Sequence, residues 1–83
     1  MIKVITEDLI ENFEEFLINE EKAQATQEKY MRDIKAFREW SRGEKLNKKT
    51  VLAYKDYLIE KFTPASVNSV LSSLNSFFDF NNM

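Results

Sequence analysis

The chain has 83 residues but only one glycine, Gly43, and one proline, Pro64. Glycine and proline most often permit or force a change of direction, so a chain nearly without them turns only a few times. Long regular segments must fill the intervals between those turns. This scarcity favours helices over a sheet of short strands.

Four segments carry apolar residues at the 3.6-residue period of an α-helix. Thr6, Asn47 and Thr63 stand where side-chain oxygens can accept hydrogen bonds from the free N–H groups of a helix start, whereas Ala23 offers no such oxygen. Pro64 would occupy a first helical position, where its missing N–H costs nothing. We therefore predict an all-α, compact four-helix domain with helices at 6–20, 24–41, 48–62 and 64–80.

The apolar stripes of these helices predict one shared core. Its expected members are Phe13, Ile34, Phe37, Leu58, Leu71, Leu74 and Phe77. Phe16 and Phe62 continue the stripes of the first and third helices, so we expect them to face inward. Aromatic rings could also stack on bases, but at helical spacing core packing is the favoured interpretation. Tyr57 lies off its stripe and is the aromatic residue most open to another role.

The residue types exclude several functions. The chain has no cysteine and no histidine, so disulfides, thiolate metal sites and a histidine base are absent. We expect no metal and no cofactor. Exposed carboxylates such as Glu7, Glu11, Glu14 and Glu15 are the only acid–base candidates, and their spacing more often marks a solvated face, so a freestanding enzyme is a poor interpretation. Neither a secretory signal nor a run of about 20 apolar residues occurs, so we expect a cytoplasmic protein that has no membrane partner.

Charge is distributed unevenly along the chain. Residues 1–21 hold one basic and seven acidic residues, a net charge of −6, whereas residues 22–55 hold ten basic and four acidic residues, a net charge of +6. Residues 56–83 carry −2, so the whole chain has a net charge of −2. The basic middle could bind a polyanion, or the charges could simply solvate helix faces, and charge alone leaves both open.

Three predicted helices share a feature at their starts. Each carries a hydroxyl at its third position, namely Thr26, Thr50 and Ser66. Free N–H groups and the helix dipole attract anions there, and a hydroxyl can add a hydrogen bond to a phosphate. Serine and threonine are also common near helix starts in any protein, so each position alone favours an ordinary structural role.

The order and spacing of several motifs resemble the N-terminal domain of tyrosine recombinases, the phage-integrase family. Thr26, Tyr30, Asp33 and Phe37 in "TQEKYMRDIKAF" carry this resemblance, together with "FEEFL", "KKTVLAYKDYL" and "TPASVNSVLSSLNSFFDF". The resemblance implies a four-helix, SAM-like core-binding domain spanning residues 1–83. Such a domain forms half of a C-shaped clamp on the recombination site. The catalytic half, with its arginines, lysine and tyrosine nucleophile, would lie C-terminal to this chain, so we expect no catalytic residue here.

The resemblance also implies which residues face DNA, because the starts of the second and fourth helices do so in the family. The implied contacts are Lys22, Gln24, Thr26, Lys29, Arg32, Ser66, Asn68, Ser69 and Ser72, with Ser73 at the edge of the set. The lysines and Arg32 would neutralise phosphates, the hydroxyls would bind them, and Asn68 could also read a base edge. Many relatives have serine at Ala23 and arginine at Ser69 and Asn75, so weak binding by this domain alone is expected.

The function expected from the resemblance is that of a non-catalytic DNA-binding domain for DNA integration and recombination. Its partners would be double-stranded DNA and other recombinase protomers on that DNA. The acidic first helix would face away from the duplex. The alternative is a small helical protein–protein interaction module whose acidic first helix docks on a basic partner.

Overall fold

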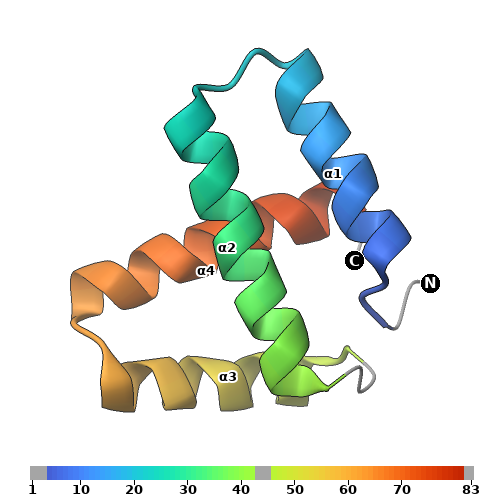
Figure 1. Cartoon of the computed structure of the whole chain (residues 1–83). Coiled ribbons are helices and arrows are strands. Elements are labelled where there is room, and N and C mark those ends of the chain that lie inside the picture. Colours follow the sequence, from blue (N-terminus) through green and yellow to red (C-terminus); the bar gives the residue numbers. More distant parts are fainter. Residues whose placement is uncertain (1–3, 43–45, 82–83) are drawn as a thin grey trace.

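A computed structural model describes residues 4–42 and 46–81 of the chain. It contains α1 (Glu7–Asn19), α2 (Gln24–Ser41), α3 (Lys48–Lys61) and α4 (Pro64–Phe80), and the described residues form no strand (Figure 1). The prediction of an all-α four-helix domain is confirmed, and each helix boundary lies within one residue of its expected position. None of the described helices is long and apolar enough to cross a membrane.

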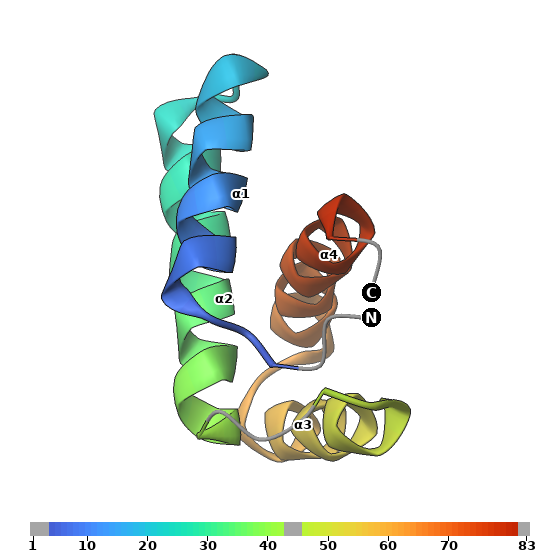
Figure 2. The same ribbon diagram turned by 90° about the vertical axis from the view of Figure 1, so that its right-hand side faces the viewer.

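The four helices form two antiparallel pairs that pack across each other. In Figure 1, α1 and α2 run side by side in opposite directions, and α3 and α4 do the same below and behind them. Figure 2 shows the α1–α2 pair as one layer and the α3–α4 pair as the other. The helix α2 crosses α4 and also contacts α1 and α3, so it is the central element of the fold.

The expected caps define the helix starts. The side chains of Thr6, Asn47 and Thr63 each accept a hydrogen bond from the N–H three residues further on, at 3.3, 2.9 and 3.3 Å. Ala23 begins α2 without a side-chain cap, and Pro64 stands at the start of α4. Three helices are therefore capped as their sequences indicate, and α2 starts without that stabilisation.

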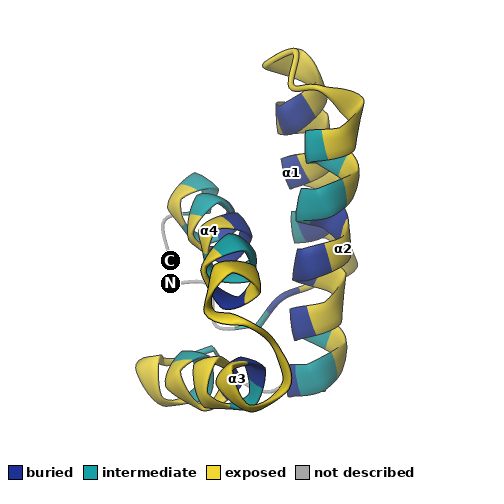
Figure 3. Cartoon of the chain, turned by 90° about the vertical axis from the view of Figure 1, so that its left-hand side faces the viewer, coloured by how far each residue is buried: buried dark blue, intermediate teal, exposed yellow. Residues whose placement is uncertain are grey.

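Six of the seven predicted core residues are 2% exposed or less; they are Phe13, Ile34, Phe37, Leu58, Leu74 and Phe77. The prediction for Leu71 is wrong, because this side chain is only half-buried and packs against the edge of the core. A step of three residues turns the helix so that Leu71 lies about 60° to one side of Leu74, in the direction away from Phe77. Figure 3 shows that the buried side of α4 faces α2, and Leu74 and Phe77 are among the buried residues of α4.

Two further stripe residues are more exposed than expected. Phe16 is 36% exposed, and its ring lies at the rim of the core against Phe80, with ring centroids 4.7 Å apart. Phe62 is 51% exposed because it follows the last turn of α3 in an extended conformation. Periodicity is a weak guide at both positions, because Phe62 lies beyond the helix and Phe16 lies at the rim of the core.

The aromatic residue set apart by its spacing, Tyr57, is part of a ring cluster. Its ring stacks on Tyr54 with centroids 5.8 Å apart and lies 5.8 Å from Trp40. The ammonium of Lys61 lies over the same ring, 5.4 Å from its centroid. Tyr57 thus packs at the α2–α3 junction, and the structure gives it a structural role.

Candidate nucleic-acid interface

A groove of about 420 Å³ lies where α2, α3 and α4 meet. It brings together four of the nine residues implied by the resemblance, namely Lys29, Arg32, Ser66 and Ser69. Apolar and aromatic side chains from the three helices, including Tyr54, Leu58 and Phe62, complete its lining. The groove therefore joins the exposed edge of α2 to the first two turns of α4.

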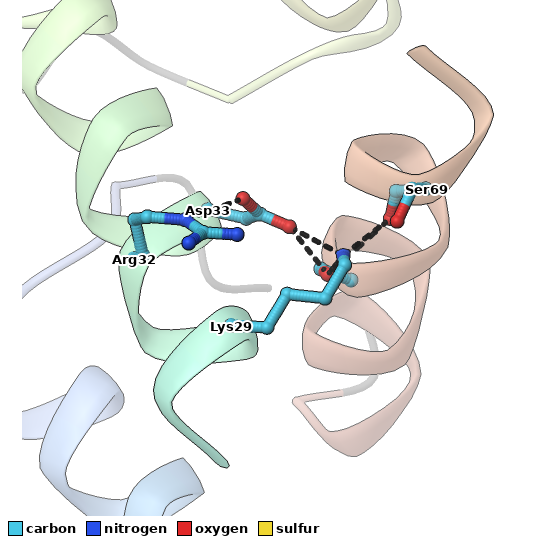
Figure 4. A network of polar contacts seen from close by, with 5 residues as sticks. Lys29, Arg32, Asp33 and Ser69 are labelled. Atoms are coloured by element: carbon cyan, nitrogen blue, oxygen red, sulfur yellow. Dashed lines mark hydrogen bonds and ion pairs between the residues drawn. The ribbon is translucent and has the colours of Figure 1, made fainter. Parts of the chain in front are cut away.

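A polar network crosses from α2 to α4 beside this groove (Figure 4). The Lys29 ammonium donates to Oδ2 of Asp33 at 2.7 Å, to the backbone carbonyl of Ser69 at 3.0 Å and to Oγ of Ser73 at 2.9 Å. The Ser73 hydroxyl in turn donates to Asp33 Oδ2 at 2.8 Å. An ammonium has three N–H donors, so all three are used within the protein.

The network is largely shielded from water. Ser73 is 0% exposed and Asp33 is 6% exposed, whereas the Lys29 side chain is 32% exposed. A buried carboxylate requires a positive partner or several hydrogen bonds, and Asp33 has both. Within the described residues, every buried side-chain nitrogen and oxygen has a partner.

Arg32 differs sharply from Lys29, although the resemblance implied the same role for both. Its side chain is 74% exposed, and its Nε lies 3.7 Å from Oδ1 of Asp33. Figure 4 shows the guanidinium beside the network and outside its cluster of short hydrogen bonds. At this groove, Arg32 therefore offers the more accessible positive charge.

The other implied residues do not line this groove. Gln24 lines a second hollow of about 470 Å³ between α1 and α2, which it shares with Glu14, Arg32 and Lys35. Asn68 lines a third hollow of about 330 Å³ between the end of α3 and the start of α4. The side chain of Gln24 also donates to Glu28 at 3.2 Å.

The remaining three residues are spread over α4, α2 and the turn before α2. Ser72 is exposed on the outer side of α4, Thr26 is half-buried, and Lys22 is exposed in the turn that connects α1 to α2. The expected residues are thus spread over α2, α4 and the turn before α2. They do not converge on one pocket.

Exposed acidic residues cluster on α1, whereas basic residues of α2 lie both beside α1 and in the groove. The acidic side chains of α1 are all exposed; they are Glu7, Asp8, Glu11, Glu14 and Glu15. In Figure 1, α1 lies on one side of α2 and the first turns of α4 lie on the other. Basic residues also lie on the acidic side: Arg38 donates to Glu7 at 2.8 Å, and Lys35, Arg38 and Arg42 line a hollow of about 640 Å³ with Glu7. The expected orientation, with α1 away from the candidate surface, is compatible with this arrangement.

The groove holds one ionisable group with a shifted pKa. Burial raises the pKa of the Tyr54 phenol above its ordinary value of 10.0, with smaller contributions from Tyr57 and Asp33. The phenol is therefore neutral at physiological pH and is not activated as a nucleophile. The described residues also contain no group of three or more histidine, cysteine or acidic side chains arranged to hold a metal ion.

Sequence reasoning missed the network that links α2 to α4. The spacing of Lys29 and Asp33 is that of a helical ion pair, which was a usable signal. The hydrogen bonds from Lys29 to Ser69 and Ser73 span 40 and 44 residues, so no local sequence pattern predicts them. The sequence offers no indication that Ser69 and Ser73 bind side chains of α2.

Comparison with known families gives one match. The model of the phage integrase N-terminal SAM-like domain matches residues 9–80, which include all four helices except the first two residues of α1. No curated protein and no solved structure matches the chain significantly. The family match covers well over half of the chain and agrees with its four-helix fold. The chain therefore belongs to the family of phage integrase N-terminal SAM-like domains.

Proposed function

We propose that this domain binds double-stranded DNA and forms the non-catalytic half of a tyrosine-recombinase clamp on a recombination site. The observation that carries the proposal is the groove between α2 and α4, which combines the exposed Arg32 with the hydroxyls of Ser66 and Ser69. Cations neutralise phosphates, and hydroxyls and helix starts add hydrogen bonds to them. Family membership supplies the recombination context.

The proposed contacts follow from exposure and position. Arg32 and Lys22 are exposed cations that would neutralise phosphates. The hydroxyl of Ser66 accepts from Thr63 at 3.2 Å, which leaves its own proton for a phosphate oxygen. Asn68 is exposed beside the start of α4 and would contact a base edge or a phosphate. Gln24, Thr26, Ser69 and Ser72 would complete the surface.

Strand cleavage and rejoining would be carried out by a separate catalytic domain. The exposed acidic side of α1 would repel the duplex and remain available to a neighbouring recombinase protomer. A neutral α4 surface, rich in serine and asparagine, supplies little charge of its own. We therefore expect weak binding at low salt that falls steeply as salt is added.

An NMR titration of the isotope-labelled chain with duplex DNA at low salt tests the proposal. Backbone amide shifts should change in residues 22–32 and 65–73, while residues 7–20 stay nearly unchanged. If the shift changes occur mainly in residues 7–20, or if the affinity does not depend on salt, the proposal is wrong. A protein-interaction role for α1 would then be favoured.

Charge reversal provides a matched comparison. Arg32→Glu should weaken binding at least tenfold, because it replaces an exposed cation of the groove with an anion. Lys48→Glu is the control, because Lys48 is also exposed but lies at the start of α3, where an acidic side chain interacts favourably with the helix dipole. Equal losses for both variants would mean that only net charge matters. Neutralising Glu11 and Glu15 should leave binding intact or slightly stronger.

A further inference from the structure

We propose that Lys29 is a positioning residue of the DNA-binding surface: its ammonium fixes α4 against α2 and contacts no phosphate. This inference rests on the proposed function and reverses the role that the family resemblance implies for Lys29. It also separates Lys29 from Arg32, which lies three residues further along α2.

The first argument is the number of donors. The three acceptors of Lys29 are a carboxylate oxygen, a backbone carbonyl and a hydroxyl, all between 2.7 and 3.0 Å. A phosphate could be bound only if at least one of these bonds were broken. Breaking the bond to Asp33 would leave a carboxylate whose side chain is 8% exposed without its short ion pair. Such a group is costly to leave uncompensated in the protein interior.

The second argument is the location of the network. Asp33 follows Arg32 directly in α2, and Ser69 lies about one turn after Ser66 in α4. The ammonium thus ties together the two short segments that carry the cation and the hydroxyls of the groove (Figure 4). Loss of these hydrogen bonds would let the two segments move relative to each other. DNA affinity would then fall although no phosphate contact is lost.

The salt dependence of binding distinguishes the two roles. Each phosphate contact contributes roughly 0.9 to the slope of log affinity against log salt. Arg32→Met should therefore lower the slope by about that amount. Lys29→Met should weaken binding and leave the slope unchanged. A slope reduction in Lys29→Met equal to that in Arg32→Met would overturn the proposal.

A second substitution provides a rescue test. Lys29→Met leaves Asp33 without its partner, whereas Lys29→Met combined with Asp33→Asn removes the buried charge and keeps an oxygen that can accept from Ser73. The pair should recover most of the affinity lost in Lys29→Met. Asp33→Asn alone, measured in parallel, corrects for removing an acid near DNA. If the double variant recovers no more affinity than this correction explains, the positioning role is contradicted. If Lys29→Met does not fold, the slope is measured on the double variant instead.

A measurement without DNA keeps this inference separate from the proposed function. NMR of the Lys29 side chain in the free protein should show ammonium protons that exchange slowly with water, since all three are hydrogen-bonded. Adding duplex DNA should leave the ammonium nitrogen shift unchanged. A shift that moves with DNA, or fast exchange in the free protein, would refute the role of Lys29. Failure of the wild-type chain to bind duplex DNA would instead refute the proposed function. The exchange measurement would still show whether Lys29 forms its three hydrogen bonds in the free protein.

Discussion

The rings of Phe13 and Phe77 meet edge to face, with centroids 5.4 Å apart and an angle of 87° between their planes. This geometry is a preferred one for aromatic pairs, and both side chains are 0% exposed. The contact joins the first helix to the last, across 64 residues of sequence. The core is therefore a single unit, and the stability of each helix depends on the others.

Two leucines one turn apart on α4 test this description of the core. Leu74→Ala should reduce the free energy of unfolding by about 2–5 kcal/mol, because the fully buried side chain leaves a cavity. Leu71→Ala should cost clearly less, because the native side chain is only half-buried. Urea unfolding followed by circular dichroism measures both values. Equal losses would contradict the observed rotation of α4.

The start of α2 offers a stabilising substitution. Ala23 caps this helix without a side-chain hydrogen bond, so Ala23→Ser should raise the free energy of unfolding by about 0.5–2 kcal/mol. The reverse change at a capped start, Thr63→Ala, should lower it by a similar amount. Thermal unfolding of the two variants beside the wild type measures the difference. No gain from Ala23→Ser would mean that the turn before α2 cannot accommodate a cap.

Tyr54 predicts an alkaline loss of stability. Its pKa is raised by burial, so the unfolded chain releases the phenolic proton near pH 10.0, before the folded chain does. The stabilisation is complete below pH 10.0 and is lost as the pH rises from there through the higher folded pKa. Tyr54→Phe lacks this dependence. The stability difference between wild type and Tyr54→Phe, measured by urea unfolding, should therefore change only above that pH.

The isolated chain is expected to leave DNA intact. Its three tyrosines are Tyr30, Tyr54 and Tyr57, and each packs against another aromatic ring. Incubation with a suicide substrate for tyrosine recombinases should give no covalent protein–DNA adduct by denaturing gel electrophoresis. An intact recombinase serves as the positive control. An adduct on any of these tyrosines would show that the catalytic residue lies within the chain.

Local signals predict the helices well and their rotation less well. Thr6, Asn47, Thr63 and Pro64 mark helix starts through bonds within one turn, so the sequence alone reveals them. Burial depends on which neighbour covers a given side of the helix. For this reason the inward prediction for Leu71 is wrong and Phe16 reaches only the rim of the core.

The candidate site could be predicted only as a set of surface residues. Helical spacing and family resemblance indicate the starts of α2 and α4, and four of those residues do line one groove. The different environments of Arg32 and Lys29 depend on hydrogen-bond acceptors in α4, which are Ser69 and Ser73. Apolar periodicity ignores a buried serine such as Ser73, so the network stays hidden until the fold is known.

The contact between α1 and the end of α4 also bears on how the chain folds during synthesis. The ring of Phe80, the last residue of α4, lies 5.4 Å from that of Phe13 and 4.7 Å from that of Phe16. Translation proceeds from the N-terminus, so α1 emerges first but cannot complete its core until the last turn of α4 is available. Until residue 80 has left the ribosome, α1 can pack on α2, as in the contact between Phe13 and Tyr30, but its contacts with Phe80 cannot form, so this part of the core is completed last.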